Sequence, residues 1–284
     1  MQSSPTPTTR WFSFSRFMRL LRAHWAERRR SHILFWLVVA SVHALLMLIL
    51  LSARHGRGAQ TEEQTIVFWC GLVTSGVVFA SLHFAALRKP ASALVFLTRP
   101  ASVFEKWLLA VLFVLFVWPL AYTISAMVIN ALASTIGYQW HVAYENAVHQ
   151  HNNVNKLDYA LFIPFIRYVK GHARLALWHF SILMIYMGLS GFSLLGCIYF
   201  KKYSGIKTSV LAFVIFLLTI LLSIIIDTIT NHNFNFRFLN WWENGYAARW
   251  YPIRYWISNL LFWLVTPVLV WICALLALHE KDLV

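Results

Sequence analysis

Residues 32–52 read HILFWLVVASVHALLMLILLS, a run of 21 residues that contains no Asp, Glu, Lys or Arg. A helix of about 20 such residues crosses the roughly 30 Å hydrocarbon layer of a bilayer. The chain as a whole has a matching composition, because 60% of its 284 residues are hydrophobic and only 12% are charged. Soluble domains carry roughly 25% charged residues. The composition therefore argues against a soluble enzyme and predicts a membrane protein.

Five further apolar runs follow the first, at residues 65–87, 107–136, 175–200, 208–226 and 255–278. Together the six runs predict an all-α polytopic membrane protein with six transmembrane helices, in one membrane domain from residue 32 to residue 284. Pro119 and Pro267 lie inside the third and sixth runs, where each is expected to kink its helix.

The first 31 residues are expected to form a cytoplasmic tail and an amphipathic interfacial helix. Residues 11–30 read WFSFSRFMRLLRAHWAERRR, in which large apolar residues recur every three or four positions and arginines occupy much of the rest. This pattern is typical of a helix that lies in the membrane interface. We expect an interfacial elbow helix that leads into the first span. The alternative is a plain topology signal with some helicity.

The distribution of basic residues predicts the orientation of the chain. With six spans, 15 Lys and Arg residues fall on the side of the termini and nine on the opposite side. Basic residues collect on the cytoplasmic side, so both termini are expected there. The formal net charge is +14. Because the basic residues flank apolar runs, anionic lipids are the expected partner and nucleic acid is not.

The connection between the second and third spans has an unusual pattern. Residues 88–107 read RKPASALVFLTRPASVFEKW, with Pro-Ala-Ser at 90–92 and again at 100–102. Proline stops a helix and serine starts one, so the pattern predicts a short apolar helix over Ala91–Leu97 and a second helix that begins at Ser102. Ser102 and Glu105 have the spacing of a capping box. The alternative is a plain helix-turn connection.

Two long segments, 137–174 and 227–254, are expected on the outer side as interfacial or re-entrant lids. The first contains an amphipathic stretch, Leu157–Val169, which Pro164 interrupts. The second mixes Trp, Tyr and Phe with Asn and Arg, as is typical of the headgroup region.

The sequence contains no recognisable catalytic, nucleotide or metal motif. Lys207-Thr208 lacks the glycines of a phosphate-binding loop, and the three cysteines lie apart in apolar runs. The histidines near the spans lie at different depths, which disfavours haem. We therefore expect no catalytic residue, cofactor or metal. His43 and Asn130 are the best buried polar candidates, and an interhelical hydrogen bond would explain each of them.

Three segments together resemble the permease subunits of type-2 ABC exporters, in a bacterial group with a Pro-Ala-Ser-x-x-Glu-Lys loop. These segments are Leu97–Trp107, Leu194–Lys202 followed by Lys207-Thr208, and the charged tail Trp271–Val284. The resemblance implies a permease in the bacterial inner membrane, paired with a second permease or a second copy of itself. A separate cytoplasmic ABC ATPase would supply the energy, and the substrate would be amphiphilic, lipid-like or a peptide.

In that family the loop after the second span carries the coupling helix that docks into the ATPase, and the segment before the last span forms re-entrant helices. Here these features would be about Ala91–Thr98 and Phe234–Trp250. The residues assigned to ATPase coupling are Ala91, Ser92, Leu94, Phe96, Leu97, Arg99, Pro100, Ser102, Glu105 and Lys106.

Two other function classes remain open at this point. The chain could be a non-transporting regulator or accessory subunit that binds a partner through loop 88–107. It could also be a membrane enzyme that acts on lipids through outer groups such as His149, His151, Glu243 and Arg249.

Overall fold

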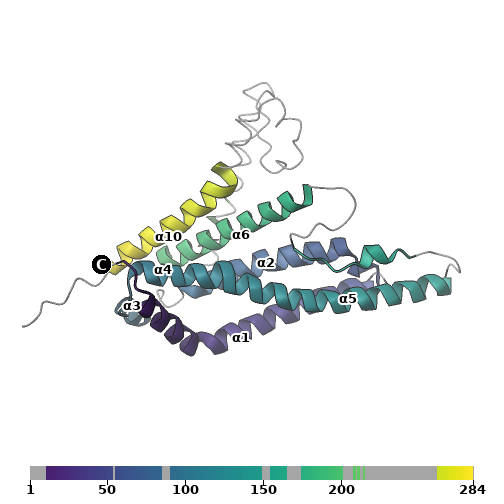
Figure 1. The fold of residues 1–284 in the computed structure, drawn as a ribbon, viewed down its shortest axis with the longest axis horizontal. Helices are drawn as coiled ribbons and strands as arrows, with labels where there is room; N and C mark the ends of the chain where they lie inside the picture. Colours follow the sequence, from purple (N-terminus) through teal and green to yellow (C-terminus); the bar gives the residue numbers. More distant parts are fainter. Residues whose placement is uncertain are drawn as a thin grey trace, which may run out of the picture. The chain divides into compact units, whose positions relative to one another are not determined.

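The computed structural model describes residues 11–53, 55–84, 90–148, 154–164, 174–200, 207–208, 210–211, 214 and 261–283 (Figure 1). Helices make up about 89% of the structure, which confirms the all-α membrane fold, and the described residues contain no strand. The helices long and apolar enough to cross a membrane are Phe14–Ala53, Thr61–His83, Val103–Val148, His179–Tyr199 and Trp263–Lys281. These five coincide with five of the expected spans. Most of the span expected at 208–226, and all of segment 227–254, lie outside the described residues.

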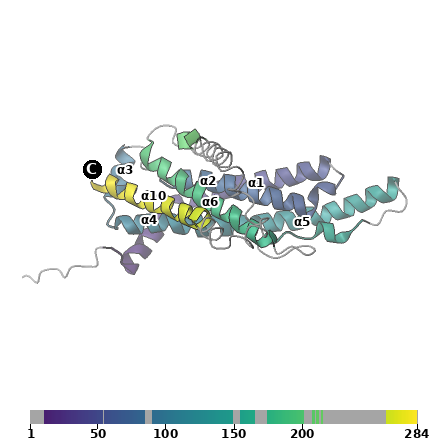
Figure 2. The ribbon, with the colours of Figure 1, turned by 90° about the horizontal axis from the view of Figure 1, so that it is seen from above.

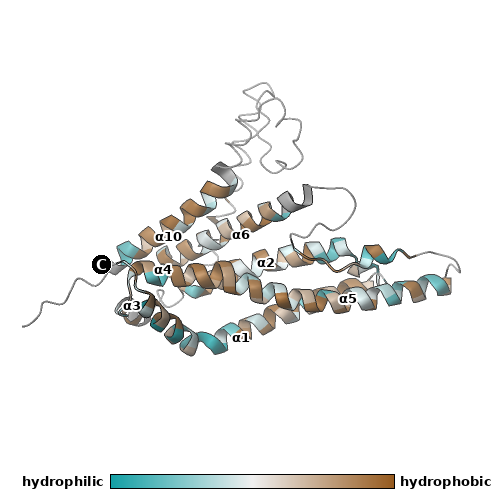
Figure 3. Ribbon diagram, in the orientation of Figure 1, coloured by the Kyte–Doolittle hydropathy of each residue, from teal (hydrophilic) through white to brown (hydrophobic). Residues whose placement is uncertain are grey.

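Helix α1 (Phe14–Ala53) is continuous over 40 residues, with no break between the amphipathic segment and the first span. Its first part is rich in hydrophilic residues and its second part is apolar (Figure 3). In the first part Phe17 and Leu20 are buried, whereas Arg19 and Arg22 are exposed, as expected for an amphipathic helix. The placement of this part in the membrane interface stays a prediction.

The chain divides into two compact units. Unit one comprises residues 1–20, 77–111 and 173–284, and unit two comprises residues 21–76 and 112–172. Unit one contains α3 (Pro90–Leu97), α4 (Val103–Val111), α6 (Arg174–Tyr199) and α10 (Thr266–Leu283). Unit two contains most of α1, much of α2 (Thr61–His83) and all of α5 (Trp118–Val148).

In unit one, α6 and α10 pack side by side through a tryptophan (Figures 1 and 2). Trp271 of α10 donates its Nε1–H to the carbonyl oxygen of Met187 on α6, at 2.9 Å. The ring fits because Gly191 has no side chain, and a Cβ there would lie 2.7 Å from Trp271 Nε1. Trp107 of α4 in turn donates to the carbonyl oxygen of Trp271, at 2.9 Å. Indole N–H groups thus tie α4, α10 and α6 together.

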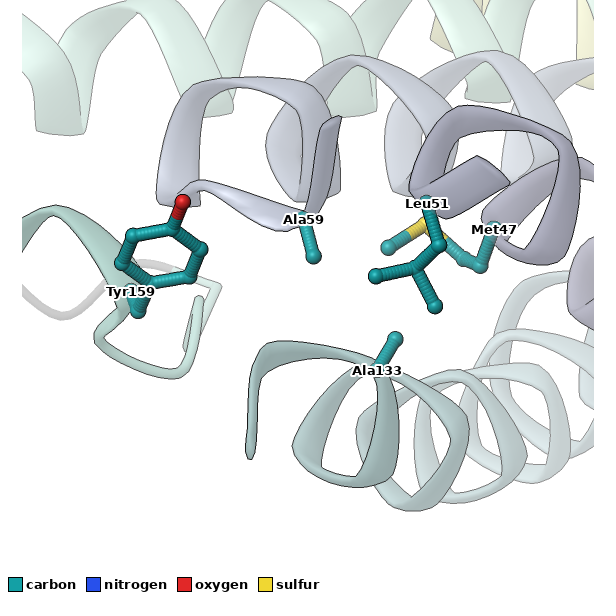
Figure 4. Packing of buried hydrophobic residues seen from close by; sticks show 5 residues of the cluster. All are labelled: Met47, Leu51, Ala59, Ala133 and Tyr159. Atoms are coloured by element: carbon teal, nitrogen blue, oxygen red, sulfur yellow. The ribbon is translucent and has the colours of Figure 1, made fainter. Parts of the chain in front are cut away.

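In unit two, a tight turn between α1 and α2 packs against α5. The turn contains η1 (Arg57–Ala59), and its Ala59 packs in one core with Met47, Leu51, Ala133 and Tyr159 (Figure 4). Gly56 adopts a φ of +87°, a left-handed conformation that glycine takes without strain. A Cβ on Gly56 would also lie 2.9 Å from the backbone nitrogen of His141 on α5. Glycine at this position allows both the turn and its close contact with α5.

Helix α5 is longer than expected, because it continues past residue 136 to Val148. The sequence analysis had placed the beginning of an outer loop at Gly137. The extra turns carry His141 and Glu145, which are one helical turn apart and both buried. Contacts of these two polar residues with other parts of unit two hold the additional turns in place.

Both prolines inside spans follow π-helical segments, η3 (Leu112–Val117) before Pro119 and η5 (Leu261–Val265) before Pro267. Proline has no N–H to donate, and its ring clashes with the carbonyl oxygen one turn earlier. A locally wider helix relieves this conflict, and such π segments accompany helix kinks. A π-helical segment thus precedes each proline at which a kink is expected, and the kinks themselves stay predictions.

The amphipathic stretch Leu157–Val169 belongs to a segment expected to form interfacial helices or re-entrant pieces, and its described part is not α-helical. A short 3-10 turn, η4 (Lys156–Tyr159), is followed by residues without regular structure, and residues 165–169 lie outside the description. Gln64 of α2 holds this segment in place, because its amide oxygen accepts from Phe162 N at 3.1 Å. The Thr61 hydroxyl donates to Ala160 O, at 2.7 Å. Backbone groups that would be paired within a helix are thus paired with α2.

Replacing Gln64 with leucine should release this segment. Gln64 is fully buried, and leucine keeps most of the volume but removes the acceptor for Phe162 N. We expect amide hydrogen exchange of a peptide covering residues 158–163 to become about tenfold faster, the effect of losing roughly 1.4 kcal/mol of local protection. Thr74→Val on the same helix is the control, since the Thr74 hydroxyl bonds only its own helix in the described contacts. Unchanged exchange in Gln64→Leu would contradict the anchoring role.

Candidate partner-docking site

The short helix expected between the second and third spans is present as α3, and it presents an apolar face. Leu94 is 67% exposed and Val95 is 60% exposed. Pro90 stands at the first helical position, where its missing N–H costs nothing. At the other end, the backbone N–H and the hydroxyl of Thr98 both donate to Leu94 O, at 2.9 and 2.8 Å. Helix α3 is therefore closed at both ends by local sequence.

Phe96 anchors α3 within unit one. Its ring contacts the ring of Phe84 edge to face, with centroids 5.7 Å apart. The Arg99 guanidinium and the Lys106 ammonium each lie 5.8 Å from the centroid of Phe96, within the range of cation–π attraction. Lys106 is 1% exposed. Phe96 thus holds one side of α3 inward while Leu94 and Val95 remain exposed.

Glu105, at the start of α4, is fully buried and collects four hydrogen bonds. Arg16 of α1 donates through Nε to both carboxylate oxygens, at 2.9 and 2.7 Å. The backbone N–H of Ser13 donates to Oε1 at 2.8 Å, and that of Ser102 donates to Oε2 at 3.0 Å. Glu105 N in turn donates to the Ser102 hydroxyl, at 3.2 Å. This reciprocal pair confirms the capping box predicted from the sequence.

The Ser102 hydroxyl also binds the N-terminal segment, because it donates to Trp11 O at 2.6 Å. Phe12 lies edge to face with Phe104, with ring centroids 6.3 Å apart. Residues 11–16 are therefore joined to residues 102–105 by backbone, hydroxyl, carboxylate and ring contacts. We call this set of contacts the N-terminal clasp.

The structure brings together two groups of the residues expected in the docking site. Phe96, Arg99 and Lys106 meet at the Phe96 ring, and Ser102 and Glu105 form the clasp. Leu94 and Pro100 are exposed and contribute surface. Ala91, Ser92 and Leu97 lie on α3, and their side chains are outside the description.

Three clasp residues were missed by the sequence analysis: Trp11, Ser13 and Arg16. The only available signal was that Glu105 stands alone as a carboxylate in a basic loop, which implies a cation nearby. The identity of that cation could not be read, because Arg16 is 89 residues away and is surrounded by other arginines.

Unit two contains a second polar cluster that the sequence did not reveal. Arg57 of η1 donates Nε–H to His141 Nε2 at 3.0 Å, and it also donates to Glu145 Oε1. His141 Nε2 also lies 3.2 Å from Glu145 Oε1, and His141 Nδ1 lies 2.7 Å from Tyr159 Oη. Burial raises the pKa of the Tyr159 phenol, so this group stays protonated. The cluster joins η1, α5 and η4.

Within the described residues no group of three or more His, Cys, Asp and Glu side chains could hold a metal ion. His149, His151, Glu243 and Arg249, named for the lipid-enzyme alternative, lie outside those residues.

The fold and these sites define an all-α, multi-pass membrane protein. Comparison with family models, with curated proteins and with solved structures finds no match. The function must therefore be argued from the site itself.

Proposed function

We propose that this chain is the permease subunit of an ABC-type exporter in the bacterial inner membrane, with both termini in the cytoplasm. It has no catalytic residue of its own in this proposal. A separate cytoplasmic ATPase drives it, and it works as a homodimer or with a second permease. The substrate class that fits the resemblance is amphiphilic, lipid-like or peptidic.

The observation that carries the proposal is α3. A helix of eight residues between two spans presents two adjacent large apolar side chains, Leu94 and Val95, to its surroundings. Such exposure is costly in water unless a partner covers it. A short helix with an exposed apolar face fits a hydrophobic groove on another protein. Phe96 and the clasp give this helix a fixed base, which a mechanical connection to an ATPase requires.

The basic face of α1 supports the expected contact with anionic lipids. Arg19, Arg22, Arg29 and Arg30 are exposed. Each basic residue near an anionic membrane surface contributes about 1 kcal/mol to binding. The clasp joins the beginning of α1 to loop residues 102–105, so lipid contacts of α1 would help to fix the docking loop at the membrane surface.

The proposal predicts that the α3 face is needed to bind an ATPase. The test is affinity purification from the native membrane in mild detergent, with mass spectrometry of the co-purifying proteins. In the double variant Leu94→Ser with Val95→Ser, a Walker-type ATPase that accompanies the wild type should fall at least about tenfold, the effect of losing 1.4 kcal/mol or more of apolar burial. Leu157→Ser is the matched control, because Leu157 is 61% exposed and lies in unit two.

Two results would contradict the permease proposal. One is capture of the same ATPase by the double variant, which would contradict docking through α3, the observation that carries the proposal. The other is loss of a non-ATPase partner from the double variant while no ATPase accompanies either protein. That second result would favour the accessory-subunit function, which uses the same exposed face.

A further inference from the structure

A histidine inside the first span is held by hydrogen bonds on both ring nitrogens. His43 of α1 is 3% exposed. Its Nδ1 lies 3.1 Å from Tyr122 Oη, and its Nε2 lies 2.9 Å from Asn130 Oδ1, both on α5. The interhelical hydrogen bond expected for His43 and Asn130 is therefore confirmed, and the two residues bond each other. Ionisable residues inside spans often mark functional sites.

The Tyr122 hydroxyl has a second acceptor. Its oxygen lies 3.1 Å from the carbonyl oxygen of Phe68 on α2, in addition to 3.1 Å from His43 Nδ1. The hydroxyl carries one hydrogen and can therefore donate to only one of them at a time. Tyr122 is 1% exposed, so its hydroxyl donates to one of these two protein acceptors and not to water.

Counting hydrogens identifies which nitrogen of His43 can change its protonation. Asn130 Oδ1 only accepts, so His43 Nε2 carries a hydrogen in either charge state. In the neutral state Nδ1 is bare and accepts from the Tyr122 hydroxyl. When Nδ1 gains a proton it donates to Tyr122 Oη, and the hydroxyl hydrogen turns to Phe68 O. In both protonation states the ring nitrogens of His43 and the hydroxyl of Tyr122 are hydrogen-bonded. Only hydrogen atoms move between the two states.

The three packed helices contain few ionisable groups near His43. Among the described residues, Tyr122 on α5 contacts His43, and Cys70 on α2 is close enough to Tyr122 to influence it electrostatically. In sequence, the stretches around the site, residues 32–53, 64–83 and 118–144, contain no Asp, Glu, Lys or Arg. Burial removes the water that would stabilise a positive His43, and the dipoles of Asn130 and Tyr122 replace part of that stabilisation. The amide nitrogen of Asn130 is buried and has no hydrogen-bond partner among the residues that the structure describes.

We propose that His43, Tyr122 and Asn130 form a proton-binding site within unit two, in which His43 Nδ1 takes up and releases one proton. One N–H bond forms as hydronium gives up its proton and becomes water, and release reverses this step without oxidation or reduction. The site is independent of the proposed function, because an ATP-driven permease needs no proton. Its consequence is that the stability or activity of the protein depends on pH through this histidine.

The test is nitrogen-15 NMR of histidine in the full chain, reconstituted in lipid nanodiscs, from pH 5 to pH 8.5. The His43 signals are assigned by their absence in His43→Gln. We expect Nδ1 to change from the unprotonated to the protonated shift as the pH falls, while Nε2 remains protonated throughout. A constant Nδ1 shift over the whole range, or titration at Nε2, would overturn the proposal.

Two further variants keep the test decisive if His43→Gln does not fold. Asn130→Asp places a carboxylate beside Nε2, which should raise the titration midpoint of the same signal by about one pH unit or more. Tyr122→Phe removes the acceptor for the Nδ1 proton and should lower the midpoint. His55→Gln changes an exposed histidine outside the spans and should leave it unchanged. A midpoint that responds to neither Asn130→Asp nor Tyr122→Phe would also overturn the proposal.

Discussion

Glu105→Gln should lower the free energy of unfolding by about 2 kcal/mol, and the melting temperature in mild detergent by roughly 4–8 °C. The glutamine keeps the size of the side chain but removes the negative charge that faces Arg16. It also replaces one of the two carboxylate oxygens with an amide NH2, so either Ser13 N or Ser102 N loses its acceptor. Arg16 is 25% exposed, so water partly compensates it, and the loss stays below that of a fully buried ion pair.

The matched control is Glu62→Gln, the same change at an exposed position in the first turn of α2. It should change stability by less than about 0.5 kcal/mol. If the two variants melt at the same temperature, the clasp contributes nothing to stability. The docking test adds a second readout, because a loosened clasp should also reduce ATPase capture.

Gly137→Ala should cost at least about 2 kcal/mol, because the packing of unit two leaves no room for a methyl group. The added Cβ would lie 2.7 Å from Ala59 Cβ, 2.9 Å from Gly56 O and 3.0 Å from Leu51 Cδ2. Two of these neighbours are a backbone atom and a Cβ, which cannot rotate away. The helix α5 or the η1 turn must therefore shift. The measurement is the melting temperature in detergent, with an expected fall of roughly 4–8 °C.

Gly188→Ala is the comparison for this prediction, since it makes the same change in helix α6. A Cβ there would meet Pro267 Cγ at 3.8 Å, an ordinary van der Waals contact. Alanine favours the helix over glycine by up to about 1 kcal/mol, so this variant should be neutral or slightly more stable. Equal behaviour of the two alanine variants would mean that α5 and the η1 turn are not closely packed.

Features of the fold that depend on residues close together in the sequence could be predicted. Apolar runs identified the five described spanning helices, because the bilayer sets their length and character. The capping box of Ser102 and Glu105 was readable because its partners are three residues apart. The irregularities before Pro119 and Pro267 follow from the missing N–H of each proline itself.

Features that depend on contacts between residues far apart in the sequence could not be predicted. Arg16 and Glu105 are 89 residues apart, and Arg57 and Glu145 are 88 apart. A single sequence contains several candidate partners for each and no information to choose among them. The extension of α5 to Val148 has the same cause, because Arg57 and Tyr159 contact its last turns. The pairing of Gln64 with the backbone of Phe162 could not be predicted for the same reason, because these residues are 98 apart.

The separation of Arg16 and Glu105 also sets an order of events during synthesis. At about 5–20 residues per second, Glu105 is made roughly 4–18 s after Arg16. During that interval the guanidinium is free to bind water or lipid phosphates, and the first helix can enter the bilayer without its carboxylate partner. The N-terminal clasp therefore closes late, after α1 and α2 have been made, and it fixes the beginning of the chain only when the start of α4 arrives.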